Sequence, residues 1–321
     1  MDFRLTDEQT ALRDGMRALL EGRFGREGLR RAADGTGPPW DAPLWKELAE
    51  AGLFALRLPE EEGGVGLGLP EAALLFEEAG RALVPGPLVA THLAAGLVPG
   101  AAEGTCVVTE AGFPPGERTA LVAHLPAAHR LLRLDDEDGA GTVRAPHTTG
   151  VAAGPLRSVD PATPLHRVDA DAVADGPVLD GADARRLRRE AAVLTAAQQL
   201  GSAGRTVETA VEHARHREQF GSPVGAFQAV KHLCAEMLVR LETARAAVYA
   251  AAVTGTESDC ATAKLLADEA AVRNARDCLQ VHGGMGFTWE ADVHLHLKRA
   301  WVLERVPPAR EELEERLAAA L

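Results

Sequence analysis

The feature that most constrains the folding of this 321-residue chain is a series of long helical patterns in its C-terminal half. Ala and Leu recur there with the spacing of one helix face, over segments too long to be single strands. Aromatic residues make up only 4% of the chain, which favours helices over a β-rich fold. Helices with such stripes usually pack as a bundle, with the stripes in its core. We predict helices at residues 184–216, 226–254, 259–281, 291–303 and 308–317.

The N-terminal part carries helix signals of its own. Thr6 and Gln9 fit a capping box, in which two side chains bond the free backbone groups that begin a helix. Further helices are expected at residues 44–51 and 70–83, with a loop rich in Glu and Gly at 60–68 between them. We therefore expect an N-terminal helical domain.

Between these two helical regions the periodicity fades. Short apolar runs, such as residues 106–108 and 119–122, stand between Gly, Pro and Asp clusters, as expected of short strands. The order of the signals predicts a mainly α protein with a small β module. The predicted parts are an N-terminal helical domain (1–104), a β domain (105–180) and a C-terminal helical bundle (181–321).

The composition argues against several classes of function. A formal net charge of -13 is unlike that of a general nucleic-acid or membrane-surface binder, so an anionic ligand would need local basic groups. The N-terminus lacks the apolar core of a signal peptide, and no uninterrupted apolar stretch reaches about 18 residues. We expect a cytoplasmic protein that binds neither nucleic acid nor membrane.

Cysteine and histidine positions give no metal signal. The four Cys residues lie far apart without a C-x-x-C pair, and we expect buried free thiols. They are Cys106, Cys234, Cys260 and Cys278. His294 and His296, near His282, are two residues apart and so face different sides of a helix. No metal site is predicted.

Two segments at the ends of long predicted helices carry ligand-binding chemistry. The first, REQFGSPVGAFQ, starts with the planar cation of Arg217. It adds amides at Gln219 and Gln228 and ring faces at Phe220 and Phe227. Such groups can pair with a phosphate and with a heterocyclic base.

The second segment, QVHGGMGFTWE, runs from Gln280 through Val281 and His282 to Gly283 and Gly284. Without Cβ atoms, the Gly pair lets the backbone approach a bulky anion, and the bare amides of such a turn can donate to phosphate oxygens. Each segment alone is common at helix ends. Together they offer what a pyrophosphate with an attached adenosine needs.

The two segments resemble those of the acyl-CoA dehydrogenase family, which carries R-x-x-F-G, then an F/H-Q pair, and later Q-x-x-G-G-x-G-F/Y. The matching residues are Arg217, Phe220, Gly221, Phe227, Gln228, Gln280, Gly283, Gly284, Gly286 and Phe287. The resemblance covers most of the chain and is most specific between residues 191 and 299. It implies an α domain, a β domain that is reduced here, and a C-terminal four-helix bundle. FAD is the implied cofactor, bound by the ten residues of the two segments described above, and an acyl-CoA is the implied substrate.

The chain departs from the family where the flavin ring would lie. Family members carry a segment like T-E-P-x-A-G-S-D that cradles the flavin. Thr109 and Glu110 match its start, but Ala-Gly-Phe-Pro-Pro follows from Ala111 to Pro115. The family's next strand, with its Trp or Phe, has no visible counterpart. We therefore expect the half of the site that holds the flavin ring to be missing.

The catalytic base of the family is also missing. Many members use the Glu of an E-G-T motif to remove the α proton, and counting along this chain gives Pro307 at that position. Others place the base on the helix before the arginine segment, where counting back gives Ala191. Glu190 is one residue away, about 100° round a helix, and is expected to be a surface charge. Glu290, after Thr288, is expected to be a first-turn acid of a helix. The sequence assigns no catalytic residue to this chain.

In the resembled family one subunit holds the flavin ring and the base, and its neighbour supplies the arginine segment and the glycine turn. This chain keeps the neighbour's half. It resembles the short, non-catalytic β subunit of the α2β2 acyl-CoA dehydrogenases of actinobacterial steroid side-chain degradation, in which a longer partner carries the Glu. Two alternatives stay open: a self-sufficient homo-oligomeric dehydrogenase or related flavoenzyme, and a degenerate paralogue that serves as a scaffold or binding protein. The sequence does not identify the acyl chain, the partner or the electron acceptor.

Overall fold

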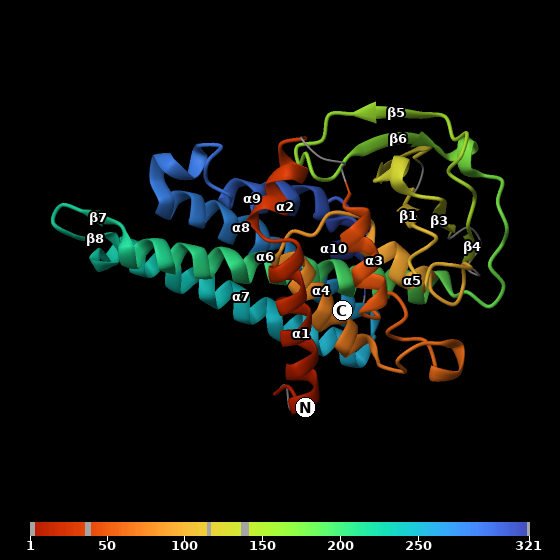
Figure 1. Ribbon diagram of the computed structural model, residues 1–321, viewed down its shortest axis with the longest axis horizontal. Coiled ribbons are helices and arrows are strands. Elements are labelled where there is room, and N and C mark those ends of the chain that lie inside the picture. The colour runs from red at the N-terminus through yellow and green to blue at the C-terminus, as the bar shows by residue number, and fades with distance from the viewer. Residues whose placement is uncertain (1–3, 36–39, 114–116, 136–140, 320–321) are drawn as a thin grey trace.

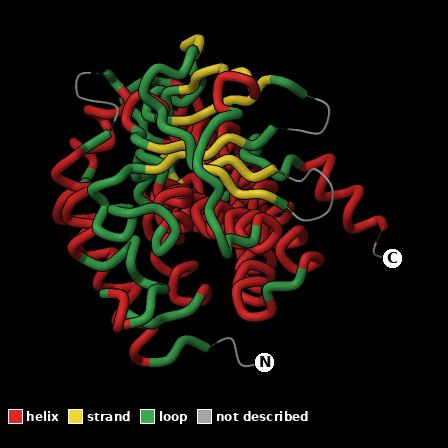
Figure 2. The backbone as a smooth tube through the Cα atoms, turned by 90° about the vertical axis from the view of Figure 1, so that its right-hand side faces the viewer, coloured by secondary structure: helices red, strands yellow, loops and turns green. Residues whose placement is uncertain are grey.

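The computed structural model describes residues 4–35, 40–113, 117–135 and 141–319. Helices build both ends of the chain and strands lie between them, so the predicted mainly α fold with a small β module is confirmed (Figures 1 and 2). The N-terminal helices are α1 (Asp7–Arg23), α2 (Arg26–Ala33), α3 (Ala42–Glu50), α4 (Leu69–Arg81) and α5 (Leu88–Ala94). The C-terminal helices are α6 (Ala184–His216), α7 (Gln228–Thr254), α8 (Glu257–His282), α9 (Val293–Leu303) and α10 (Arg310–Ala319).

The start of α1 follows the predicted capping box. The backbone amide of Gln9 donates to Thr6 Oγ1 at 3.1 Å, and the amide of Thr6 donates to Gln9 Oε1 at 3.1 Å. The loop at 60–68 is present and contains one short 3-10 turn, Glu60–Glu62. Helix α5 was not predicted, because its seven residues are buried on every side and show no helical period.

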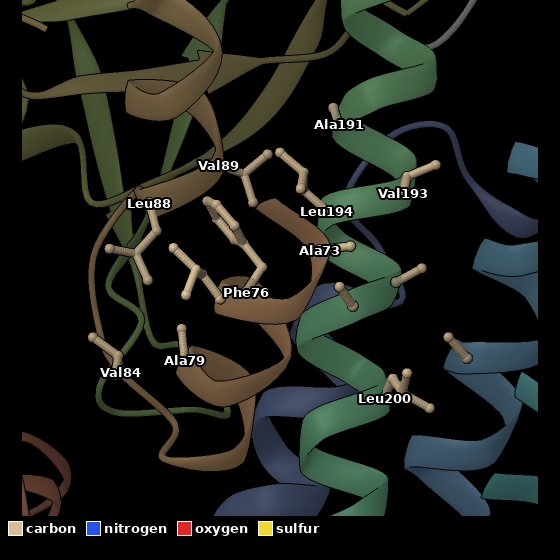
Figure 3. Close-up of a cluster of buried hydrophobic side chains, with 14 of the residues drawn as sticks. Ala73, Phe76, Ala79, Val84, Leu88, Val89, Ala191, Val193, Leu194 and Leu200 are labelled. Atoms are coloured by element: carbon tan, nitrogen blue, oxygen red, sulfur yellow. The ribbon is translucent and has the colours of Figure 1, made fainter. Parts of the chain in front are cut away.

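Helix α6 is the centre of the molecule. Asp183 caps its first turn by accepting a hydrogen bond from the amide of Arg186, and its bounds agree with the sequence prediction. The helix packs against α4, α5, α7, α8 and α9. Apolar side chains of α4, α5 and α6, including Phe76 and Leu194, meet in one buried cluster (Figure 3). Burial of a side chain of that size contributes about 1.5–3 kcal/mol.

The β module consists of two three-stranded sheets. The first has the order β1 (Val108–Ala111), β3 (Arg130–Asp135), β4 (Thr142–Arg144), and the second β2 (Thr119–Ala123), β6 (Leu165–Asp169), β5 (Ala153–Leu156). Strands β1 and β3 run parallel, and the other pairs are antiparallel. The buried Arg299 of α9 donates to the buried carboxylate of Asp160, which ties the module to the helices.

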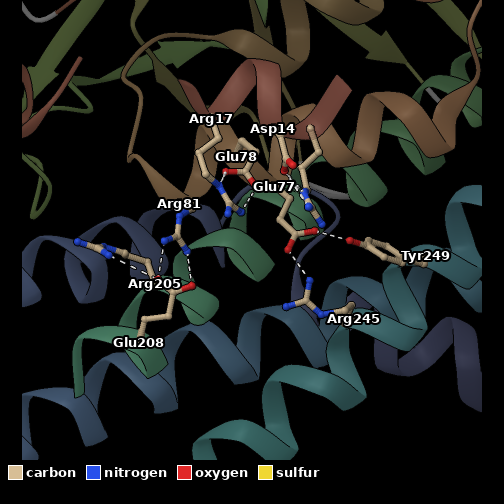
Figure 4. A network of polar contacts seen from close by, with 10 residues as sticks. Asp14, Arg17, Glu77, Glu78, Arg81, Arg205, Glu208, Arg245 and Tyr249 are labelled. Atoms are coloured by element: carbon tan, nitrogen blue, oxygen red, sulfur yellow. Dashed lines mark hydrogen bonds and ion pairs between the residues drawn. The ribbon is translucent and has the colours of Figure 1, made fainter. Parts of the chain in front are cut away.

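A network of ion pairs holds the helices in register (Figure 4). Glu77 of α4 is buried and accepts hydrogen bonds from Arg245 Nη1 at 2.6 Å and from the Tyr249 hydroxyl at 2.8 Å, both on α7. Arg17 of α1 donates to both carboxylate oxygens of Glu78, at 2.8 and 2.6 Å. Charged hydrogen bonds of this kind contribute about 1.5–3 kcal/mol each when they are shielded from water.

Candidate functional site

The two predicted ligand-binding segments lie at the same end of the molecule (Figure 1). Arg217 follows the last residue of α6, and a hairpin of β7 (Glu218–Gln219) and β8 (Ser222–Pro223) leads from it to α7. The ring of His213 near the end of α6 stacks on the ring of His282 at the end of α8, with centroids 4.1 Å apart. The structure therefore places the ends of α6 and α8, from which the two segments lead, side by side.

The arginine segment is open to solvent. Phe220, at the turn of the hairpin, is 93% exposed, and Phe227 is 42% exposed. Their rings meet edge to face with centroids 6.2 Å apart. Phe220 adopts a positive φ of 55°, a conformation that a bulky side chain rarely holds without a reason. An exposed pair of aromatic rings on a protruding hairpin is typical of a contact surface.

The polar members of the arginine segment are also exposed. Arg217 and Gln228 lie at the surface, and Gln219 Nε2 donates to the backbone oxygen of Glu218 at 2.8 Å. Gln228 is the first residue of α7, where helix N-terminal amides favour negative charge. The guanidinium of Arg217, the side-chain amides of Gln219 and Gln228, and the start of α7 are therefore all accessible to solvent.

The glycine turn follows α8 as a 3-10 segment, Gly283–Phe287. Gly283 has a positive φ of 62°, and a Cβ at Gly283 or Gly284 would meet no other atom within 4 Å, so the backbone there faces open space. Gln280 is exposed, whereas Val281 and His282 are half-buried, and the His282 ring is held at 2.8 Å from the Cys278 carbonyl oxygen. The apolar residues Met285 and Phe287 are 54% and 75% exposed.

The residues of the two segments have the chemistry to contact the ADP portion of FAD, but they could cover only one side of it. The cation, the amides and the bare turn are the groups that a pyrophosphate needs, yet they form an open surface rather than an enclosed cleft. No metal-ligand cluster of three or more His, Cys, Asp or Glu occurs among the described residues. The thiols are free, and Cys260 and Cys278 are buried as predicted, whereas Cys106 and Cys234 are half-buried.

A cavity of about 570 Å³ adjoins this end, between α1, α2, α4, α6 and the connection from α8 to α9. Arginines line this cavity, and two of them form ion pairs with carboxylates: Arg17 pairs with Glu78, and Arg81 pairs with Glu208. The stacked His213 also lines it, and burial lowers the pKa of that histidine.

The two positions predicted for a catalytic base converge on a different cavity, also of about 570 Å³. Ala191 of α6 and Pro307, after α9, both line it, and neither side chain can accept a proton. Pro307 also packs on the chain beyond β1, since a Cβ on Gly112 would lie 2.5 Å from Pro307 Cγ. The segment that would approach a flavin ring is therefore in contact with the segment that would carry the base. Pro114 and Pro115 lie outside the described residues.

Sequence reasoning missed one acid in this second cavity, Glu110 of β1. Burial raises the pKa of its carboxyl to about 7, although the charge of Lys264 acts in the opposite direction. The ammonium group of Lys264 is itself engaged by Asp268 and by the Leu303 carbonyl oxygen, the latter at 3.1 Å. The signal was present as the Thr-Glu pair at 109–110, but only the fold shows that the Glu faces a cavity.

The interpretation of Glu190 as a surface charge is wrong. Its carboxylate accepts hydrogen bonds from both terminal nitrogens of Arg57, at 2.7 and 2.8 Å, and its side chain is only 12% exposed. Arg57 lies in the loop after α3, far away in sequence, so no local pattern could reveal the pair. Both oxygens are engaged, which leaves Glu190 a structural role.

The interpretation of Glu290 as a first-turn acid is also wrong. Helix α9 begins at Val293, and Glu290 lies in the turn before it. The Glu290 carbonyl oxygen accepts a hydrogen bond from Arg26 at 2.8 Å, and Arg26 also binds Asp292. The turn is thus fastened to α2 rather than coupled to a helix dipole.

Comparisons with known proteins agree with this fold. Family models described as "Acyl-CoA dehydrogenase, N-terminal domain" and "Acyl-CoA dehydrogenase, C-terminal domain" match residues 6–105 and 185–306. The acyl-CoA dehydrogenase IpdE2 of Mycobacterium tuberculosis is 35% identical over 303 residues, which cover 92% of this chain and 91% of that protein.

Two solved structures are similar over nearly the whole chain. The ChsE4-ChsE5 complex from Mycobacterium tuberculosis matches with a TM-score of 0.86 and 25% identity, over 99% of this chain and 98% of that one. A variant of the Tcur3481-Tcur3483 steroid ACAD matches with a TM-score of 0.83 and 25% identity, over 98% and 97%. The chain belongs to the acyl-CoA dehydrogenase family. Its enzyme class is therefore that of the oxidoreductases that act on acyl-CoA thioesters.

Among the described residues, no helix is both long enough and apolar enough to cross a bilayer.

Proposed function

We propose that this chain is the shorter subunit of a hetero-oligomeric, FAD-dependent acyl-CoA dehydrogenase of α2β2 type. It contributes the ADP half of a shared FAD site. The ten predicted site residues of the arginine segment and the glycine turn form this half. A longer partner of the same family supplies the flavin ring site and the catalytic base. When bound, FAD takes up the two electrons that leave the acyl group.

One observation carries the proposal. The chain keeps the segments that bind the ADP portion of FAD in this family, but it lacks a proton acceptor at both positions of the family's catalytic base. The arginine segment and the glycine turn leave from adjacent ends of α6 and α8 and are mostly exposed. Ala191 and Pro307, by contrast, stand at the base positions, and Pro307 packs on Gly112. A chain that kept a site of its own would need a proton acceptor at one of the two base positions, and Glu110, which lines the same cavity, stands at neither. An exposed half-site is useful when another subunit covers it.

The comparisons support a partner and a substrate class. The two structures named above are a complex of two differently named chains, and an enzyme described as a steroid ACAD. We propose that the substrate of the assembled enzyme is the CoA thioester of a steroid side chain or of a steroid-derived acid. The division into residues 1–104, 105–180 and 181–321 follows the same family layout and stays part of this proposal.

The test is the flavin content of the protein made in two ways. The chain is expressed alone, and together with a longer acyl-CoA dehydrogenase encoded beside it, and bound flavin is measured by absorbance after gel filtration. We expect little FAD on the single chain and one FAD for each pair of unlike chains in the complex. Stoichiometric FAD and turnover in the isolated chain would instead favour a self-sufficient homo-oligomer.

A further inference from the structure

The cavity between α1, α2, α4, α6 and the connection from α8 to α9 is built from five separate parts of the fold. Part of its lining is hydrocarbon. Leu20 and Phe24, at the end of α1, are 2% and 3% exposed, and Leu29 of α2 and Met285 after α8 extend this surface. The volume of about 570 Å³ falls within the range of small-molecule sites in proteins. The cavity can therefore hold the apolar body of a small organic molecule.

The cavity lies on a different face of α8 from the exposed part of the ADP half-site. Cys278 and His282 line the cavity, and Gln280, an exposed residue of the half-site, stands midway between them in sequence. Successive helix residues are turned by about 100°, so the Gln280 side chain points about 160° away from both. An inference about this cavity therefore does not depend on flavin sharing.

One of the arginines that line the cavity has donors to spare. Only Nη1 of Arg205 has a partner among the described residues, and that partner is the Glu208 carboxylate at 3.5 Å, a long hydrogen bond. The same carboxylate is already bound by both terminal nitrogens of Arg81 (Figure 4). The other lining arginines have closer partners, in the pairs Arg17–Glu78, Arg26–Asp292 and Arg81–Glu208.

Two uncharged polar groups of the lining also have a free position. No described residue bonds the hydroxyl of Thr209, one helical turn beyond Arg205 on α6. His296 of α9 is 8% exposed, and Ser202 engages its Nδ1 at 2.8 Å, which leaves Nε2 without a partner among the described residues. A buried polar group of this kind usually meets a ligand or an ordered water.

These three groups gather along one side of α6. Ser202, which holds the His296 ring, and then Arg205 and Thr209 follow one another at spacings of three and four residues, so their side chains are neighbours on the helix surface. A guanidinium, a hydroxyl and a ring nitrogen therefore line one strip of the cavity beside its apolar surface.

The remaining charges decide which ligand fits this strip. Glu21 and Glu290 also line the cavity and have no described partner for their carboxylates, but both residues are exposed, so that water and salt screen their repulsion of an anion. A dianion such as phosphate would need a second cation with free donors, whereas a monoanionic carboxylate matches the planar fork of one guanidinium.

We propose that this cavity binds a small apolar carboxylic acid in its anionic form. The carboxylate accepts hydrogen bonds from the Arg205 guanidinium, the Thr209 hydroxyl and the Nε2–H of His296. The Ser202 hydroxyl donates to Nδ1 of that ring and so leaves the proton on Nε2. The hydrocarbon body of the acid packs against Leu20 and Phe24.

The test compares 2-naphthoate with 2-naphthamide, a neutral molecule of the same shape, and with acetate, which lacks the apolar body. Their affinities for the full chain are measured by isothermal titration calorimetry at pH 7. We expect naphthoate to bind about tenfold more tightly than naphthamide, because only the carboxylate makes charge-assisted hydrogen bonds. Acetate should bind about a hundredfold more weakly than naphthoate, since it buries little apolar surface.

Four variants assign the binding to this cavity. Arg205→Met should bring naphthoate down to the affinity of naphthamide, and Thr209→Val should weaken naphthoate about threefold. Ala82→Leu narrows the cavity and should weaken both aromatic probes alike. Arg215→Met removes an exposed cation from the end of the same helix and is the matched control, which should leave both affinities as in the parent.

Several results would overturn the proposal. Equal affinities of the parent for naphthoate and naphthamide would do so, as would the absence of saturable binding. An unchanged preference for naphthoate in Arg205→Met, or binding that Ala82→Leu leaves intact, would place the acid elsewhere. A preference lost equally in Arg215→Met would mean general attraction to positive charge. Thermal unfolding of each variant separates a lost site from a lost fold.

Discussion

The backbone of Gly201 on α6 touches the backbone of Glu77 on α4: a Cβ on Gly201 would lie 1.8 Å from the Glu77 carbonyl oxygen. One turn away the contact is reciprocal, because a Cβ on Gly80 would lie 2.0 Å from the carbonyl oxygen of Gln198. Glycines on both helices thus let α4 and α6 cross in direct contact. The crossing also places the Glu77 carboxylate where Arg245 and Tyr249 of α7 reach it.

The close crossing predicts a large cost for one methyl group. Gly201→Ala would force α4 and α6 apart, and we expect the free energy of unfolding to fall by about 3 kcal/mol. Gly204→Ala, on the same helix, is the control: its Cβ would meet only Leu241 side-chain atoms at 3.8 and 4.0 Å. That variant should be neutral or more stable by up to about 1 kcal/mol. The free energies of unfolding of the two variants are measured by urea unfolding. Equal values for Gly201→Ala and Gly204→Ala would contradict the close contact between α4 and α6.

The Glu77 network predicts unequal effects for its two donors. Arg245→Met leaves a buried carboxylate without its cation, and we expect a loss of about 2 kcal/mol, reduced from the full cost of a broken buried pair because Arg245 is 30% exposed. Tyr249→Phe removes one hydrogen bond and should cost about 1 kcal/mol. Arg310→Met removes a partner from the exposed pair with Glu314 and should change stability by less than about 0.5 kcal/mol. Thermal unfolding compares the three.

Local sequence signals were sufficient for the long helices. Helix α6 was predicted with its observed bounds, because Asp183 caps its start and its apolar residues recur over many turns. The end of α7 at Thr254 also agrees with the sequence prediction, because Gly255 ends that helix with a positive φ. The exposed glycine turn was found because Gly283 and Gly284 follow directly on a long predicted helix. These features depend on neighbours in sequence.

Features that depend on distant residues could not be predicted. The arginines beside Glu190 in sequence suggest a surface charge, whereas its actual partner, Arg57, comes from another part of the chain. The stacking of His213 on His282 joins two helices whose register the sequence does not give. Glu110 could be read as a motif remnant, but its unpaired carboxyl in a cavity is a property of packing.

Buried histidines predict a loss of stability in mild acid. Burial lowers the pKa of His296 to about 3, with Arg205 and Arg299 acting in the same direction, while the unfolded chain takes up the proton near pH 6.5. Below pH 6.5 the unfolded state therefore binds more protons, and the free energy of unfolding falls as the pH falls. This one histidine contributes up to about 1.4 kcal/mol per pH unit.

The measurement is urea unfolding between pH 6 and pH 4. His296→Gln, which keeps a group able to bond the Ser202 hydroxyl, should make the dependence of unfolding free energy on pH shallower by about that amount. His232→Gln, on the exposed face of α7, should leave the dependence as in the parent. Parallel curves for all three proteins would refute the assignment.

If Arg217 contacts the pyrophosphate of FAD, its substitution should lower the affinity of the complex for FAD. Arg217→Ala should weaken FAD retention about ten- to a hundredfold, because a guanidinium on a pyrophosphate makes charge-assisted bonds worth roughly 1.5–3 kcal/mol. Arg217→Lys should rescue this loss only in part, since an ammonium lacks the planar fork. Arg215→Ala removes a neighbouring exposed cation at the end of the same helix and serves as the control. Flavin affinity is measured by titration of the apo complex.

The last prediction concerns the base. Glu190→Gln and Glu290→Gln should each leave the dehydrogenation rate of the complex within about tenfold of the parent, whereas loss of a catalytic base typically costs a hundredfold or more. Glu190 binds Arg57 with both oxygens, and Glu290 lies in a turn fastened to α2. Glu190→Gln should instead lower stability by about 1 kcal/mol, because one hydrogen bond to Arg57 is lost.

The opposite outcome is equally informative, because stability and chemistry can be measured separately on each variant. Ala191 and Pro307 cannot hold a proton, so a rate that collapses in Glu190→Gln, with full flavin and normal unfolding, would mean that Arg57 releases this carboxylate when substrate binds. The base would then lie in this chain, and the division of labour between unlike subunits would be refuted. If both variants keep their rate, neither Glu190 nor Glu290 is the base. An unchanged rate in Glu110→Gln would then exclude the acid that lines the same cavity as Ala191, and substitution of one Glu in the longer partner should abolish turnover while FAD stays bound.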